Sequence, residues 1–150
     1  MKRLLNAAAI AAVVFSLVGC GDNGKPSVLP VSGKVTFKKK DPAAGALLVF
    51  HPTDPALEKR IGGKPFAKVG DDGTFKLTSY NEGDGAPEGE YGVTVQWQAA
   101  AKEAKFSLGG EGGGGGRSMI NEAKYGKPKV PFMKVTVKKG EANTFDFDVD

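Results

Sequence analysis

The feature that most constrains this fold is an alternation of apolar and polar residues over residues 90–98. Tyr91, Val93, Val95 and Trp97 fall on one side of this stretch, and the residues between them are small or polar. Because successive side chains of a β-strand point to opposite faces, this period of two predicts a half-buried strand. We expect Tyr91 and Trp97 to pack into a core behind the strand rather than to form an exposed sugar-binding platform.

Further segments carry similar strand signals, and together they predict an all-β chain of about seven short strands. The other segments are residues 31–38, 46–50, 66–69, 74–79, 133–138 and 144–149. The unbroken apolar run at 46–50 predicts a central strand, which we expect His51-Pro52 to end. The chain also has 22 glycines and 9 prolines, which fit many turns. We expect a hairpin turn at Asp71-Asp72-Gly73 and a loop over residues 53–64.

The N-terminal residues 1–19 have the layout of an export signal. Lys2 and Arg3 give a positive start, and residues 4–18 are apolar apart from Asn6 and Ser16. The apolar stretch is shorter than the roughly 20 residues that cross a bilayer comfortably. Residues 17–20, Leu-Val-Gly-Cys, resemble the lipobox of bacterial lipoproteins. The alternative is an ordinary signal peptide with an incidental cysteine.

Cys20 is the only cysteine, so no intrachain disulfide can form. The lipobox resemblance implies a lipoprotein whose Cys20 carries acyl chains such as palmitate, and two or three chains make anchoring stable. Residues 20–30 are polar and rich in turn formers, so we predict a flexible tether there, followed by one domain over 31–150. We therefore expect an exported protein anchored to a membrane of the bacterial cell envelope. Gly21 leaves open which membrane that is.

The charge pattern argues against a nucleic-acid partner. Once Lys2 and Arg3 are removed with the signal, 19 of the 21 basic residues remain against 17 acidic residues. The two signs are interspersed along the mature chain, which lacks the basic stripe typical of nucleic-acid binders.

Several motifs resemble the carboxypeptidase regulatory-like, or transthyretin-like, domain. They are Val-Ser-Gly-Lys-Val at 31–35, Gly-Ala at 45–46, His-Pro at 51–52, the segment 72–78 and the segment 83–91. The version with Gly-Asp-Gly-Ala-Pro, here at 83–87, is similar to small lipoproteins of planctomycete bacteria. The resemblance covers residues 31–98 and 124–150, with a glycine-rich insertion at about 99–123. It implies an antiparallel prealbumin- or Ig-like β-sandwich with a surface role and no catalytic residue.

We therefore predict a non-enzymatic binding or structural module without a cofactor, whose partners are the membrane and other envelope proteins or polysaccharide. His51 is the only histidine, and a lone histidine is far more often structural than catalytic. Asp71, Asp72 and Asp84 are weak metal candidates, because their spacing does not match a calcium loop and Asp-Gly is also ordinary turn chemistry. The alternative function is a metal-dependent or hydrolytic enzyme with its site in these acidic loops.

The last two predicted strands suggest a hairpin with a defined register. If residues 139–143 form its loop, Lys134 lies opposite Asp148 and Val135 opposite Phe147. Apolar and polar side chains then separate cleanly onto two faces. We expect Phe145 and Phe147 in the core, and lysines facing aspartates in an exposed stripe.

Overall fold

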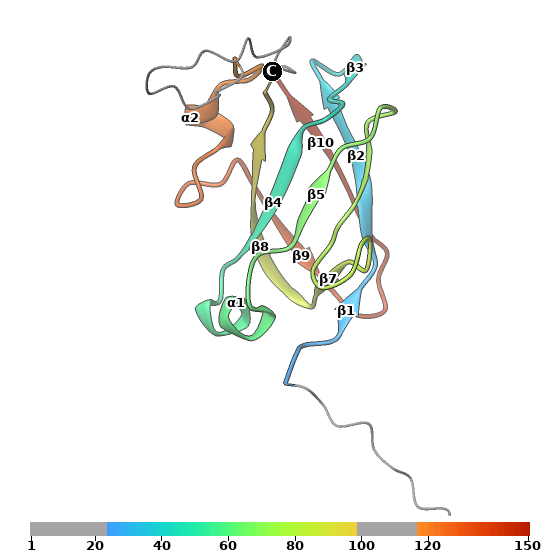
Figure 1. Cartoon of the computed structure of the whole chain (residues 1–150), viewed down its shortest axis with the longest axis vertical. Helices are drawn as coiled ribbons and strands as arrows, with labels where there is room; N and C mark the ends of the chain where they lie inside the picture. The colour runs from blue at the N-terminus through green and yellow to red at the C-terminus, as the bar shows by residue number, and fades with distance from the viewer. Residues whose placement is uncertain (1–23, 99–116) are drawn as a thin grey trace, which may run out of the picture.

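A computed structural model describes residues 24–98 and 117–150 of the protein (Figure 1). Strands dominate its regular structure, which confirms the all-β class. The strands are β1 (Val28–Leu29), β2 (Val31–Phe37), β3 (Asp41–Pro42), β4 (Leu47–Pro52), β5 (Phe66–Lys68), β6 (Thr74–Lys76), β7 (Ala86–Pro87), β8 (Gly89–Gln96), β9 (Met133–Val137) and β10 (Asn143–Val149). The helices are α1 (Pro55–Ile61) and α2 (Glu122–Tyr125). No helix in these ranges is long and apolar enough to span a membrane.

The strands form two four-stranded sheets and one two-stranded sheet. One large sheet has the order β5-β4-β8-β9; in the other, β10 and β3 flank β2, which also pairs with β6. β1 pairs with β7 in the small sheet. Each of the seven predicted segments contains a strand, and the additional strands β1, β3 and β7 have two residues each. The pairing of β10 with β2 is parallel, whereas an antiparallel arrangement was predicted.

The alternation over residues 90–98 has the predicted consequence. Tyr91, Val93 and Val95 on β8 are fully buried. The Trp97 ring is half-buried and packs edge-on against Phe37, with ring centroids 5.4 Å apart. Its indole N–H donates to the carbonyl oxygen of Ala44 at 2.8 Å, which satisfies the one polar atom of the ring. Tyr91 and Trp97 therefore belong to the core, as predicted.

β4 is a central strand, as predicted, but it continues through His51 to Pro52. Its core side is fully buried at Leu48 and Phe50. Its other side, which includes His51, is half-buried. Pro52 takes the last position of the strand, where the loss of one backbone donor is tolerated.

The prediction of a loop over residues 53–64 was wrong, because residues 55–61 form α1. The Asp54 carboxylate accepts a hydrogen bond from the N–H of Ala56 at 2.8 Å and caps the helix. Gly62 ends the helix in the left-handed conformation, with φ 78°. Leu57 and Ile61, one turn apart, are buried against the core. A seven-residue helix is marginal by itself, so this packing stabilises it.

The predicted C-terminal hairpin was also wrong, because β9 and β10 lie in different sheets. β9 pairs antiparallel with β8, which places Lys134 opposite Gly92. β10 pairs parallel with β2, which places Asp148 opposite Thr36. The polar stripe therefore forms between β10 and β2, and Lys134 has no role in it. The alternation of apolar and polar residues sets which face of a strand is buried, but it does not identify the neighbouring strand.

The Asn143 side chain explains how the chain leaves one sheet and enters the other. Its Oδ1 accepts from the N–H of Lys138 at 2.9 Å, and its Nδ2 donates to the carbonyl oxygen of Lys138 at 3.1 Å. The amide thus takes the place of a paired backbone unit at the end of β9. Asn143 is only 8% exposed, so these bonds satisfy a polar group that is largely shielded from water.

The two large sheets face each other across an aromatic core. Phe147 of β10 is 3% exposed, and its ring centroid lies 6.3 Å from that of Phe50 of β4 in the facing sheet. The rings of Phe75 and Phe132 lie 5.9 and 5.8 Å from Phe147. Phe145 is half-buried and packs against the same core. The predicted burial of Phe147 is therefore confirmed, although its strand partner is different.

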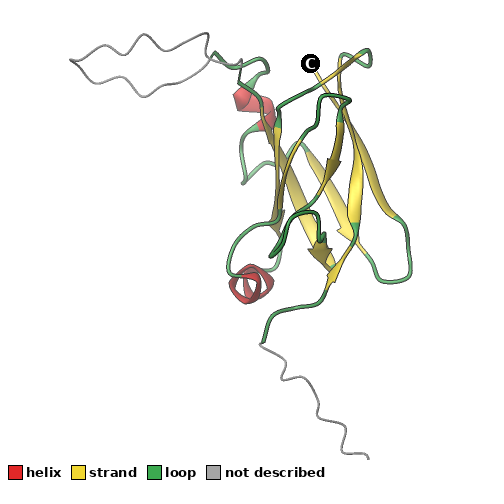
Figure 2. Ribbon diagram, turned by 45° about the vertical axis from the view of Figure 1, so that its right-hand side comes forward, coloured by secondary structure: helices red, strands yellow, loops and turns green. Residues whose placement is uncertain are grey.

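The lateral openings between the sheets are closed by different means. On one side, Phe66 and Thr78 exchange two backbone hydrogen bonds, of 3.0 and 2.8 Å. On the other side, Phe132 and Tyr125 of α2 pack edge-on with centroids 5.2 Å apart, and the Tyr125 hydroxyl hydrogen-bonds to the Asp150 carboxylate. Figure 2 shows α2 beside the sheets and α1 near the end of the molecule that holds β1.

Candidate functional site

The sequence-predicted lipidation site, Cys20, lies outside the described residues, as does the glycine-rich segment 109–116. The described chain begins at Gly24, near β1 and at the opposite end of the molecule from the C-terminus (Figure 1). Val28 pairs with Pro87, so the chain joins the fold eight residues after Cys20. The last residues of the stretch expected to be a tether are therefore part of the folded domain.

Asp84 organises the loop between β6 and β7. Its carboxylate accepts hydrogen bonds from the backbone N–H groups of Ser79, Asn81 and Tyr80 at 2.7, 2.8 and 3.0 Å. Partial burial alone would raise the pKa of Asp84, but these bonds favour the charged form more strongly and hold the pKa below its usual value. The carboxylate is therefore engaged in holding the loop.

The backbone conformation and the space around it explain why glycines flank Asp84. Gly85 has φ 100°, and a Cβ placed there would lie 1.8 Å from the carbonyl oxygen of Leu29. Its N–H donates to the carbonyl oxygen of Leu77 at 2.7 Å. Gly83 also has a positive φ, of 70°, but the atom nearest to a Cβ placed there would be 3.7 Å away, an ordinary contact distance. The Gly-Asp-Gly-Ala-Pro segment thus shapes the loop that leads to the β1–β7 pair.

The Tyr91 hydroxyl ties the start of β8 to the preceding strand. It donates to the carbonyl oxygen of Pro87 at 2.7 Å. Burial raises the pKa of this phenol far above its usual value, so the group stays protonated and keeps its donor. The bond was not foreseen, since the strand pattern indicates only that the ring is buried.

Asp71 and Asp72 lie in a tight turn, as expected, and the N–H of Gly73 donates to the carbonyl oxygen of Gly70 at 3.0 Å. Asp72 Oδ1 accepts from the N–H and the hydroxyl of Thr74 at 2.9 and 2.7 Å. These bonds lower the pKa of Asp72. The N–H of Gly70 also donates to the carbonyl oxygen of Thr74 at 2.8 Å, and Phe66 and Thr78 form an antiparallel bridge further from the turn. The predicted hairpin turn is therefore present, although its arms β5 and β6 belong to different sheets.

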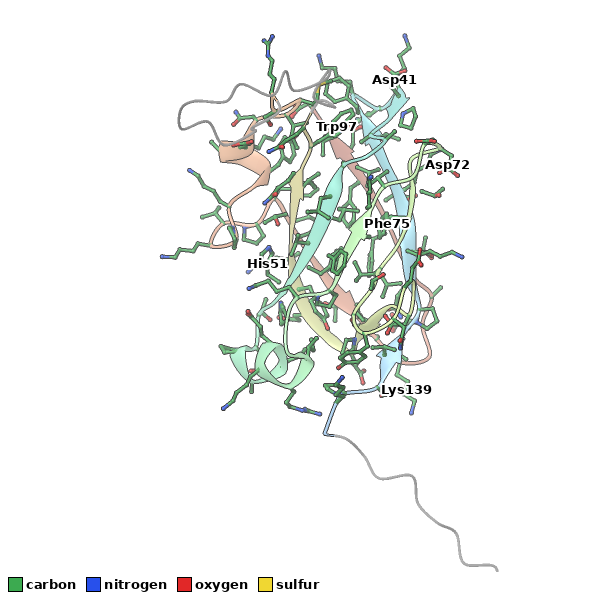
Figure 3. The ribbon with its side chains drawn as sticks, viewed as in Figure 1. Asp41, His51, Asp72, Phe75, Trp97 and Lys139 are labelled. Carbon is green, nitrogen blue, oxygen red and sulfur yellow. The ribbon has the colours of Figure 1, made fainter. Side chains whose placement is uncertain are left out.

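The three metal candidates do not form one cluster. Asp72 lies toward the end of the molecule that holds Trp97 (Figure 3), whereas the Asp84 loop leads into β7 near the opposite end. Within residues 24–98 and 117–150, no group of three or more His, Cys, Asp or Glu side chains is placed to hold a metal ion.

His51 forms a polar link on the outer side of the β4 sheet. Its Nε2 lies 2.9 Å from the hydroxyl oxygen of Thr94, which is 2% exposed. Its Nδ1 is buried, and no atom of residues 24–98 or 117–150 forms a hydrogen bond with it. Burial, followed by the positive charge of Lys64, lowers the His51 pKa, and Glu58 opposes this shift. A neutral imidazole bonded to one hydroxyl, with no carboxylate bonded to its other nitrogen, does not reproduce a catalytic triad.

Comparisons of the chain with protein-family models, characterised proteins and solved structures found no match.

Proposed function

We propose that the protein is a non-enzymatic, lipid-anchored component of the bacterial cell envelope that binds or supports other envelope components. The observation that carries this proposal is the position of Cys20. It is the only cysteine, and it follows Gly19 at the end of an apolar export segment. An acyl-modified residue there would hold the domain close to a membrane, since four residues from Cys20 to Gly24 span at most about 14 Å.

A prealbumin- or Ig-like sandwich is the proposed form of the domain. Two facing four-stranded sheets and a shared aromatic core support it. The bond from the Tyr91 hydroxyl to Pro87 gives further support, because a tyrosine that bonds back to the backbone just upstream is typical of Ig-like sandwiches. The family resemblance to transthyretin-like lipoproteins rests on the same region of the chain.

The arrangement of acidic residues supports a role without catalysis. A hydrolase or metal enzyme in the acidic loops would need titratable groups that converge on one point. Asp72 and Asp84 instead bind backbone groups of two separate turns. We therefore favour a partner that is recognised by an exposed surface, either another envelope protein or a polysaccharide, and not a nucleic acid.

The anchor can be tested with the full chain in a bacterial host that processes lipoproteins. We expect the natural chain to fractionate with membranes, incorporate labelled palmitate and begin at an acylated Cys20 by mass spectrometry. Cys20→Ala should lose the label and be released from membranes, whereas the control Gly21→Ala should behave as the natural chain. An unmodified Cys20, or a mature N-terminus elsewhere, would contradict the proposal.

A further inference from the structure

One stretch near the C-terminal end of the chain is rich in positive charge. Residues 123–140 contain six lysines and no acidic residue. Two of these lysines form ion pairs, Lys124 with Asp150 at 2.5 Å and Lys138 with Glu141 at 3.4 Å. Lys127, Lys129 and Lys134 are exposed, and no ion pair to them occurs within the described ranges. Three lysines on this side of the molecule are therefore exposed without an ion-pair partner among the described residues.

The same stretch holds apolar side chains in water. Val130 is 70% exposed and Met133 is 42% exposed, and they are two of the four large hydrophobic side chains exposed in the described ranges. A shallow depression beside Val130 is lined by Ala123, Lys124, Lys127, Pro131 and Phe132. We call residues 127–134 the basic loop; in Figure 1 it includes the orange segment that projects at the side between α2 and β9.

The basic loop is held firmly at its base, so Val130 does not fold back onto the core. The N–H of Val130 donates to the carbonyl oxygen of Lys127 at 3.2 Å and closes a turn over Pro128. Pro131 packs on β8 so closely that a Cβ on Gly92 would lie 2.8 Å from its ring. Phe132 is anchored among the core aromatic rings. The exposed valine is thus presented on a turn that is supported from both sides.

The outer face of the β2 sheet is a contrasting surface on the same molecule. Asp146 accepts from the N–H of Lys34 at 3.0 Å, and Asp148 accepts from the Thr36 hydroxyl at 2.8 Å. Aspartates and lysines both lie there, and no large hydrophobic side chain of β2, β6 or β10 is exposed. On the outer face of the β2 sheet the lysines are therefore not combined with an exposed apolar side chain, as they are on the basic loop.

We propose that the basic loop rests on an anionic lipid surface, with Val130 among the headgroups and the lysines against phosphate groups. This inference rests on the proposed anchor at Cys20, which would keep the domain within reach of the membrane. The eight residues from Cys20 to Val28 span at most about 28 Å, short enough to hold the side of the domain near the bilayer. Lysines beside an anionic surface and apolar residues at its interface both stabilise such contact. Lys134 lies on the edge strand β9, and a lysine there opposes the addition of another protein strand.

The test uses the full chain, extracted from the host and reconstituted into vesicles of phosphatidylcholine, alone or mixed with phosphatidylglycerol. A water-soluble reagent acetylates the lysines, and peptide mass spectrometry gives the rate at each position. We expect Lys127, Lys129 and Lys134 to react at least about fivefold more slowly on the anionic vesicles than on the neutral ones. Lys34 and Lys76, on the opposite face, should react equally on both. High salt should remove the difference, because it screens the attraction.

Variants distinguish a specific contact of the basic loop from a general attraction of the positively charged domain to anionic lipid. Lys127→Gln with Lys129→Gln should weaken the contact about 25-fold, at roughly fivefold per lysine, and restore the reactivity of Lys134. Val130→Asp should also restore it. The matched double variant, Lys34→Gln with Lys76→Gln, should leave the protection of the loop unchanged.

Two results would overturn the inference. The loop lysines could be acetylated rapidly on both kinds of vesicle, which would show no contact. They could also be acetylated slowly on both, which would indicate contact with protein instead of anionic lipid. Failure of the anchor has a different signature. A chain without an acyl anchor would not float with the neutral vesicles, because its lysines are not attracted to them. If such a chain were added to anionic vesicles and its loop lysines were acetylated slowly, the loop contact would still be supported.

Discussion

Phe147 packs against aromatic rings from both large sheets, Phe75 in its own sheet and Phe50 in the facing one. It is 3% exposed and lies within 6.3 Å, centroid to centroid, of the rings of Phe50, Phe75 and Phe132. Replacement by alanine removes a buried ring and leaves a cavity between the sheets. We expect Phe147→Ala to lower the free energy of unfolding by about 4 kcal/mol, within the range of 3–5 for buried phenylalanine.

Phe145, two residues earlier on the same strand, provides an internal comparison. It faces the core but is only half-buried, and its ring centroid lies 6.4 Å from that of Phe50. We expect Phe145→Ala to cost about 2 kcal/mol, roughly half as much, because less apolar area returns to water. Phe147→Leu keeps most of the volume and should cost about 1.5 kcal/mol.

Urea denaturation followed by fluorescence measures these differences, since Trp97, the only tryptophan, packs on Phe37 and reports on the contact between the two large sheets. The urea dependence of unfolding should be the same in all variants, so that shifts of midpoint report stability. A cost below about 1.5 kcal/mol for Phe147→Ala, or a larger cost for Phe145→Ala, would show that Phe147 is not the residue that joins the sheets.

The loops offer further predictions with the same assay. Asp84→Asn should cost about 2 kcal/mol at neutral pH, because one amide cannot replace a carboxylate that accepts three N–H groups. Since folding lowers the pKa of Asp84, its contribution is full above its unfolded pKa, near 3.9, and is lost as pH falls through the lower folded pKa; a variant with unchanged acid sensitivity would contradict this. Gly85→Ala should cost about 3 kcal/mol through strain and its clash with Leu29, whereas Gly83→Ala, with open space, should cost about 1 kcal/mol; equal costs would refute the steric argument. Asn143→Ala should cost about 2 kcal/mol, because it leaves the N–H and C=O of Lys138 without their partner; a neutral effect would show that the crossover does not depend on the amide.

The helix α1 could have been predicted from the sequence, because the signals for its start, its end and its buried face are local. Asp54-Pro55 is a helix start, and Gly62 follows the last helical residue. Leu57 and Ile61 have the spacing of one helical face. The many charged residues between Pro55 and Gly62 favoured a loop, but charges on the exposed side of a short helix give the same composition.

The candidate functional residues also include some that the sequence alone indicates and some that only the folded structure identifies. The importance of Cys20 comes from the sequence alone, since an export signal is read as a linear pattern. The role of Asp84 could not be predicted, because its N–H partners converge only after the loop has closed. The basic loop was hidden by the balanced charge of the whole chain, and its significance depends on how Pro131 and Phe132 hold Val130 in solvent.

The sequence by itself determined which segments are strands and which faces of them are buried. The alternation in β8, β9 and β10 acts residue by residue, and it is satisfied by any partner with a matching apolar face. Only the tertiary structure decided that β9 joins β8 and that β10 crosses to run parallel with β2. That choice depends on contacts between segments far apart in the chain, such as Phe147 with Phe50, and on the Asn143 amide that lets the chain change sheets.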